Sequence, residues 1–240
     1  MEKLVIIGTG GLAGEIVDFI ERYQLFEVAG FTVNEAYMKD STYMGRPVFP
    51  IESLEKHYGT DEVLLFSSVS WYNYLNRVRK EKYDELKAKG YSFANLVSPH
   101  AMIYTEDIGE GNWFHDFAHV GYGVTIGNNN IIRMHTTVSH YTILGDHNTL
   151  TSGTRIGGHV ICGDCSFFGL NSTVFNRVRI GNKCVVGGGA VVKEDLDDFS
   201  LCVSSNSFVK QCSETKIEEY ISPRHVKRTV EEFNEIKDRK

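Results

Sequence analysis

Apolar residues recur at every sixth position through the second half of the chain. Counted in steps of six from Met102 to Val192, every position is apolar. Glycine often follows that position, as at Gly109, Gly127 and Gly145. A six-residue unit of this kind is typical of one short strand and one turn, because side chains alternate along a strand and glycine tolerates the positive φ of a tight corner.

Three such units are expected to close one triangular coil of eighteen residues. A single coil cannot bury its own apolar face, so several coils must stack to form a core. The side chains that would lie above one another inside the prism are Ile108, Ile126, Leu144, Cys162 and Ile180. The pattern therefore predicts a parallel β-helix over residues 98–203. Residues 204–240 follow as a C-terminal tail of mixed charge, where a helix is expected.

The first half of the chain has a different pattern, in which short apolar runs alternate with amphipathic stretches. Strands are predicted over residues 4–7, 26–33, 63–67 and 91–96. Helices are predicted over residues 15–23, 51–58 and 72–89. This alternation predicts a small mixed α/β domain with a parallel sheet over residues 1–97.

A glycine-rich loop joins the first predicted strand to the first predicted helix. Residues 8–13 read G-T-G-G-L-A and fit the pattern G-x-G-x-x-G/A. Backbone amides in such a loop, together with the helix N-terminus, would cradle a pyrophosphate. A dinucleotide site also calls for an acidic residue at the end of the second strand, where this chain has Asn34, so NAD is not expected. A glycine turn without a ligand is the alternative interpretation.

Length, charge and cysteine content narrow the classes of function. The 240 residues allow two modest domains. The net charge is −6 and Lys and Arg do not cluster before the last thirty residues, so nucleic acid is not an expected partner. No apolar run approaches the ~20 residues of a membrane span and no signal peptide is recognisable, so a cytoplasmic protein without a membrane partner is expected. The C-x2-C at Cys162 and Cys165 has no second pair, which favours packed thiols over a zinc knuckle.

The repeat resembles the hexapeptide-repeat acyltransferases, whose fold is a left-handed parallel β-helix. With the α/β domain in front, the chain resembles the acetyltransferases of nucleotide-linked amino sugars, including the bacillosamine-pathway N-acetyltransferase and the sialic acid O-acetyltransferase group. The resemblance implies a Rossmann-like N-terminal domain that holds the nucleotide of a UDP- or dTDP-sugar. It also implies transfer of acetyl from acetyl-CoA to the sugar amine, no metal, and a homotrimer whose adjacent β-helices share the CoA groove.

The same resemblance implies that His140 is the general base. The sequence V-S-H-Y-T-I-L-G, residues 138–145, places His140 in the register of the family, two residues after an inward aliphatic side chain. The family often has Glu or Asp directly after this histidine, and here that residue is Tyr141. We therefore expect an orienting carboxylate from elsewhere, with Asp116 of the preceding coil or of a neighbouring subunit as the candidate. Water or a backbone carbonyl in its place is the alternative.

Contacts to the two substrates are carried over from the family in the same way. The matching positions for acetyl-CoA are Gly158, Leu170 and Gly188, and the amide of Gly158 is expected to hold the oxyanion one coil above the base. The family's G-x-P-A-[KR] element is absent, which leaves Lys210 as the candidate contact for the 3′-phosphate of CoA. The matching positions for the nucleotide-sugar are Gly10, Gly11, Leu12, Asn34, Ser67 and Ser68.

Three other functions stay open at this point. A sugar O-acetyltransferase would use a hydroxyl acceptor. A zinc-dependent γ-carbonic anhydrase-like enzyme would use His135 and His140, with His100 slightly out of register for a third ligand, and that class lacks the α/β domain. A non-catalytic nucleotide-sugar-binding β-helix protein would keep the fold without the chemistry.

Overall fold

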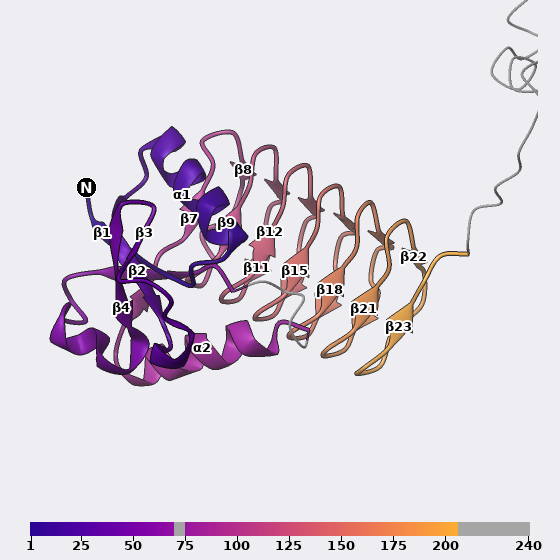
Figure 1. Ribbon diagram of the computed structural model, residues 1–240. Helices are drawn as coiled ribbons and strands as arrows, with labels where there is room; N and C mark the ends of the chain where they lie inside the picture. The colour runs from indigo at the N-terminus through magenta and orange to yellow at the C-terminus, as the bar shows by residue number, and fades with distance from the viewer. Residues whose placement is uncertain (70–74, 206–240) are drawn as a thin grey trace, which may run out of the picture. The chain divides into compact units, whose positions relative to one another are not determined.

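The computed structural model describes residues 1–69 and 75–205 (Figure 1), and Met1–Ser204 forms one compact unit. Its first part is a six-stranded sheet in the order β3-β4-β2-β1-β5-β6, parallel except for the β3–β4 pair. The elements are β1 (Lys3–Ile7), α1 (Gly11–Tyr23), β2 (Glu27–Val33), the 3₁₀ turn η1 (Glu35–Tyr37), β3 (Thr42–Tyr43), β4 (Arg46–Pro50), η2 (Ile51–Lys56), β5 (Leu64–Ser67), α2 (Arg77–Ala88) and β6 (Ser92–Phe93). The parallel sheet with its helices agrees with the sequence prediction.

Three details of this sheet differ from the prediction. The hairpin β3–β4 was not expected, and its two-residue turn has positive φ at both Met44 (49°) and Gly45 (72°), as a tight hairpin requires. The stretch predicted as a helix over 51–58 is a 3₁₀ turn, kinked at Ser53. The strand predicted over 91–96 divides into β6 and β7, of which β7 already belongs to the β-helix.

The second part is the predicted parallel β-helix, and its strands stack in three sheets that form the faces of a prism (Figure 1). The β7 face contains β7 (Leu96–Val97), β9 (Trp113–Phe114), β12 (Ile131–Ile132), β15 (Thr149–Leu150), β18 (Phe167–Phe168), β21 (Val185–Val186) and β23 (Leu201–Cys202). The β8 face contains β8 (Met102–Ile103), β10 (His119–Val120), β13 (Thr137–Val138), β16 (Arg155–Ile156), β19 (Thr173–Val174) and β22 (Val191–Val192). The β11 face contains β11 (Thr125–Ile126), β14 (Ile143–Leu144), β17 (Ile161–Cys162) and β20 (Arg179–Ile180).

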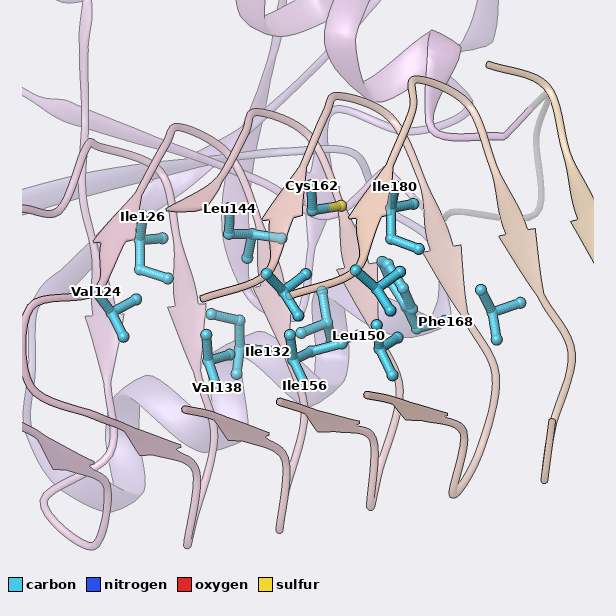
Figure 2. Close-up of a cluster of buried hydrophobic side chains, with 14 of the residues drawn as sticks. Val124, Ile126, Ile132, Val138, Leu144, Leu150, Ile156, Cys162, Phe168 and Ile180 are labelled. Carbon is cyan, nitrogen blue, oxygen red and sulfur yellow. The ribbon is translucent and has the colours of Figure 1, made fainter. Parts of the chain in front are cut away.

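The core of the prism is built from the predicted sixth-position residues, except at Met102, which is 46% exposed while Ile103 packs against the core instead. Residues eighteen apart pair in register, for example Leu144 with Cys162, and Figure 2 shows Ile126, Leu144, Cys162 and Ile180 in one row. Leu144 has no exposed surface, whereas the preceding Ile143 is 47% exposed. Strand alternation therefore divides each two-residue strand into one inward and one outward side chain. The thiols of Cys162 and Cys165 are buried and free, and burial raises the pKa of both.

A polar ladder runs beside the β7 face inside the prism. Each asparagine side-chain oxygen accepts a hydrogen bond from the backbone N–H of the residue eighteen positions later, at 2.7–2.8 Å. The acceptor and donor pairs are Asn112 with Asn130, Asn130 with Asn148, and Asn148 with Ser166. All four side chains are buried. The ladder supplies partners for backbone amides at a corner that the strand hydrogen bonds leave unpaired.

Three corners connect the faces, and each is named here by one residue. The His140 corner contains residues 121–124, 139–142, 157–160 and 175–178. The Asp164 corner contains residues 127–130, 145–148, 163–166 and 181–184. The Asp116 corner contains residues 115–118, 133–136, 151–154, 169–172 and 187–190.

The sheet domain packs directly on the first coils of the β-helix. Phe19 of α1 meets Trp113 of β9 at 5.5 Å between ring centroids, within one apolar cluster that also includes Ile131. Arg79 of α2 is fully buried and donates to the backbone oxygen of His147 at 2.8 Å. No helix in the described ranges 1–69 and 75–205 is long and apolar enough to cross a membrane.

Candidate active site

His140 lies two residues after the end of β13, and its ring covers Gly158 of the next coil. A Cβ on Gly158 would lie 2.5 Å from Nε2 and 2.6 Å from Cε1 of His140, so only glycine leaves room for the ring in this position. Gly158 is buried beneath it. The predicted eighteen-residue relationship between the two is therefore a direct contact.

The neighbours of His140 are aromatic. Tyr141, the residue that follows it, has a positive φ of 54° and stacks on His159 at 5.2 Å between ring centroids. The His140 ring meets the rings of Tyr141 and His159 nearly at right angles, at 5.9 and 5.3 Å. Within residues 1–69 and 75–205, no hydrogen bond to the His140 ring is formed.

Two hollows lie on the outer surface at this corner, and His140 lines the first of them. The Tyr122 hollow, of about 410 Å³, is lined by Tyr104, His119, Gly121, Tyr122, Ser139 and His140. The Asn176 hollow, of about 450 Å³, is lined by residues of the β8 face and the His140 corner, among them Thr137, Ser139, Arg155, Gly157, Phe175 and Asn176. Ser139 lines both, so the two hollows adjoin next to His140. Sequence reasoning missed Tyr122 and Asn176, although stepping eighteen residues from His140 and from Gly158 reaches them.

The amide of Gly158 is not free to hold an oxyanion, contrary to the prediction. Its N–H already donates to Oδ1 of Asn176 at 2.8 Å. The hydrogen bonds between strands do not reach the backbone N–H groups at the corners. At Gly158 a side chain of the next coil supplies the missing acceptor. Gly158 therefore contacts the His140 ring, while its N–H is already used in the hydrogen bond to Asn176.

Asp116 does not orient His140 within one chain, which corrects the prediction for the preceding coil. It lies at a different corner of the prism, where its carboxylate accepts hydrogen bonds from Tyr23 of α1 at 2.8 Å and from Ser98. Burial alone would raise the pKa of the Asp116 carboxyl, but the two hydrogen bonds together with the nearby His115 and His100 hold the pKa below its usual range. Asp116 therefore ties the sheet domain to the β-helix.

The remaining positions predicted for acetyl-CoA do not gather around His140. Leu170 and Gly188 line a separate hollow of about 400 Å³ at the Asp116 corner, together with Arg133. Leu170 is 59% exposed. Lys210 lies outside the described residues, as does the predicted C-terminal helix.

The sheet domain has its own hollow, of about 490 Å³, at the carboxyl ends of β1 and β2. Gly8, Thr9, Thr32, Asn34 and Lys82 are among its lining residues. The loop that carries Gly8 and Thr9 leads into the N-terminus of α1, where the first helical amides have no partner within the helix. This end of a parallel sheet is where such domains bind ligands.

Gly10 and Gly11 stand open at the N-terminus of α1. A Cβ on either would meet nothing within 4 Å. The side chain of Leu12 packs against the apolar cluster of the sheet domain.

Asn34 donates to the carboxylate of Glu52 at 2.8 Å, and this hydrogen bond is the main reason why the pKa of Glu52 is lower than usual. Ser67 and Ser68 are buried, and neither lines the hollow. The hydroxyl of Ser68 donates to the oxygen of Ile7 at 2.7 Å. The hydroxyls of both serines form hydrogen bonds with nearby backbone groups of the sheet domain.

The alternative metal site is not assembled in one chain. His135 stacks on Phe117 at the Asp116 corner, whereas His140 lies at its own corner. Over the described part of the chain, no group of three or more His, Cys, Asp or Glu side chains is arranged to hold a metal ion.

Comparisons with known proteins agree with this architecture. Residues 107–140 match the bacterial transferase hexapeptide family (six repeats). The acetyltransferase domain of PglB from Neisseria gonorrhoeae FA1090, in complex with acetyl coenzyme A, is 21% identical with a TM-score of 0.72, covering 85% of this chain and 96% of that one. WeeI from Acinetobacter baumannii AYE is 21% identical with a TM-score of 0.71, covering 85% of this chain and 97% of that one.

A third solved structure contains both kinds of substrate. It is a histidine-to-alanine variant of the GDP-perosamine N-acetyltransferase of Caulobacter crescentus with CoA and GDP-perosamine, 22% identical with a TM-score of 0.66, covering 88% of this chain and 98% of that one. At these identities the likeness establishes a shared fold. No curated protein sequence matches the chain.

Proposed function

We propose that this protein transfers an acetyl group from acetyl-CoA to the amino group of a nucleotide-linked sugar, with His140 as the general base. The observation that carries the proposal is that His140 lines one surface hollow and the neighbouring Ser139 lines both that hollow and the one adjoining it, which would give each substrate its own place. Similar folds are found in the PglB domain with acetyl-CoA and in the perosamine N-acetyltransferase with CoA and GDP-perosamine. The first supports acetyl-CoA as the donor, and the second supports an amine acceptor on a nucleotide-linked sugar.

The reaction is a direct transfer in a ternary complex. The sugar amine attacks the thioester carbonyl carbon and its proton passes to the imidazole of His140. The tetrahedral intermediate then collapses, the C–S bond breaks, and the imidazolium returns the proton to the leaving thiolate. No covalent acyl-enzyme is needed, and the buried thiols of Cys162 and Cys165 are poor nucleophiles because burial raises their pKa.

The sheet domain is proposed as a Rossmann-like holder of the nucleotide. The amides of Gly10 and Gly11 and the positive end of the α1 dipole suit a pyrophosphate. Thr32 and Asn34, at the end of β2, line the hollow where a ribose or base would lie. In this arrangement residues 1–97 bind the nucleotide and residues 98–203 carry out the transfer.

Two copies of the chain are proposed to complete each CoA site. Gly158 lies at the His140 corner, whereas Leu170 and Gly188 line a hollow at the Asp116 corner. One CoA molecule would meet all of these positions if the His140 corner of one left-handed β-helix faced the Asp116 corner of another. A closed ring of three chains satisfies this head-to-tail contact.

The test is release of free CoA thiol from acetyl-CoA with a panel of UDP-, dTDP- and GDP-linked amino sugars and their hydroxyl analogues. The proposal predicts release with an amino sugar and not with its hydroxyl analogue. Release with the hydroxyl analogue alone would establish an O-acetyltransferase instead. No release with any member would contradict the proposed activity and favour a β-helix that binds without catalysing.

A further inference from the structure

The hydrogen bond between Gly158 and Asn176 fixes the orientation of the Asn176 side chain. The backbone N–H of Gly158 is a donor, so the atom of Asn176 that receives it at 2.8 Å must be the carboxamide oxygen. The NH₂ group of Asn176 then points away from that bond. It has no acceptor among residues 1–69 and 75–205, and Asn176 is exposed on the surface of the Asn176 hollow.

The Asp164 corner contains hydrogen bonds of the same kind, from a backbone N–H to a side-chain oxygen of the next coil, that have only a structural role. There, a side-chain oxygen of each coil accepts the backbone N–H of the preceding coil, at 2.6–3.0 Å. The residues that accept are Asn128, Asp146, Asp164 and Asn182 of this corner, and Asp198, which continues the row beyond it. Asparagine and aspartate therefore serve equally well as the acceptor.

The two corners differ in what becomes of the NH₂ group. At the Asp164 corner, Nδ2 of Asn128 donates to Asp146 and Nδ2 of Asn182 donates to Asp198, each at 3.2 Å. Asn176 has the same fixed oxygen and keeps both of its amide hydrogens free within the described chain. It is thus an oriented donor at the surface.

Asn176 and His140 approach the same glycine. The His140 ring covers the outer side of Gly158, and the Asn176 carboxamide is bonded to its N–H. The two side chains line adjoining hollows that share Ser139. A carbonyl group placed at this junction would have the base on one side and an amide donor on the other.

On the basis of the proposed acyl transfer, we propose that Asn176 donates a hydrogen bond to the thioester carbonyl oxygen and stabilises the oxyanion, the role that the Gly158 amide cannot fill. As the amine attacks, the carbonyl π electrons move to the oxygen, and the Asn176 NH₂ strengthens its hydrogen bond without forming any covalent bond. A fixed neutral donor of this kind is worth about 100-fold to 1000-fold in kcat. The thioester then occupies the Asn176 hollow, and the acceptor amine enters from the Tyr122 hollow.

The test variant is Asn176→Asp, measured in the full chain with acetyl-CoA and the amino sugar that the panel identifies. Aspartate keeps the acceptor for the Gly158 amide, as it does at the Asp164 corner, but removes the donor and sets a negative charge beside the forming oxyanion. We expect kcat to fall by about 100-fold or more, with the KM for acetyl-CoA and the melting temperature nearly unchanged. Asp164→Asn, the reverse exchange at the other corner, should leave both activity and melting temperature unchanged.

Three results would overturn the inference, and they are distinguishable. The first is a kcat for Asn176→Asp within about threefold of wild type while Asn176→Ala is impaired. This result would show that the side chain only holds Gly158. A loss in Asn176→Asp that disappears at a lower temperature, where the variant is fully folded, would show the same. Wild type without turnover on the whole panel would contradict the proposed function itself, and the role of Asn176 would fall with it.

Discussion

The His140 ring lies directly on Gly158, with Nε2 only 2.5 Å from the point where a Cβ on that glycine would stand. Because the atoms in the way belong to a movable side chain, Gly158→Ala should fold normally while displacing the imidazole. We expect the melting temperature to change little and kcat to fall by roughly the 100-fold that loss of a general base costs.

A double-mutant cycle identifies the cause of that loss. If Gly158→Ala acts through His140, it should have no further effect on a His140→Ala background, because the two changes then remove the same interaction. If the fold-losses in the rate of thiol release for the two single variants multiply in the double variant, this account is contradicted.

The N-terminus of α1 offers a separate test of nucleotide binding. A side chain at Gly11 meets nothing within 4 Å, and no acidic residue is present in the first turn of the helix. Gly11→Asp should therefore preserve or slightly raise the melting temperature through the helix dipole, while its charge repels a pyrophosphate.

Isothermal titration with the nucleoside diphosphate of the active sugar should show at least about tenfold weaker binding for Gly11→Asp, or ~1.4 kcal/mol. The uncharged Gly11→Asn is the matched control and should bind close to wild type. Equal binding by both variants would place the phosphates elsewhere.

Acid should destabilise the protein through two buried histidines. Burial, with the nearby Arg133, lowers the pKa of His115 to about 4, and Arg133 donates to its Nε2 at 3.1 Å. Burial also lowers the pKa of His147 to about 4, where Nδ1 accepts from Asn129 at 2.9 Å. Both rings are therefore neutral in the folded state.

The unfolded chain takes up these protons below its ordinary histidine pKa of about 6.5, whereas the folded chain does so only near 4. Stability should fall as the pH drops through this window, by on the order of 3 kcal/mol for each histidine. Urea unfolding at several pH values measures it. His115→Gln should make the fall shallower, and the exposed His57→Gln should not. A stability that is flat from pH 7 to 4 would contradict the neutral rings.

Two neighbouring residues of the β-helix, one inward and one outward, allow a controlled measurement of how much the core contributes to the free energy of unfolding. Leu144 is fully buried and its neighbour on β14, Ile143, is 47% exposed. Leu144→Ala should lower the free energy of unfolding by about 2–5 kcal/mol, whereas Ile143→Ala should cost much less. Urea unfolding of both variants decides between them, and equal losses would mean that the inward register is wrong.

The β-helix was predictable because its period is local. Each six-residue unit places an apolar side chain inward at the same position, so residues such as Ile126 and Leu144 reveal the register without any long-range information. The polar ladder of Asn112, Asn130 and Asn148 was not expected, since its partners are backbone groups eighteen residues away. The β3–β4 hairpin was also missed, because Met44 at a positive φ gives no signal in the sequence.

The candidate site was predicted in part. The register placed His140 and Gly158 one coil apart, and they are in contact. The Gly158 amide is already paired with Asn176, and Asp116 lies at another corner of the same chain, where its Oδ1 accepts from Tyr23 and Ser98. Such competition between hydrogen-bond partners depends on tertiary contacts, which a repeat pattern does not contain.

His140 and His159 provide the most direct test of the central claim. They lie at the same corner with their rings 5.3 Å apart, and only His140 lines the Tyr122 hollow. The measurement is the initial rate of thiol release from acetyl-CoA with the active amino sugar for His140→Ala and His159→Ala. We expect a loss of about 100-fold or more for His140→Ala and a rate within about threefold of wild type for His159→Ala. A His140→Ala enzyme that keeps the wild-type rate would contradict the assignment of His140 as the base.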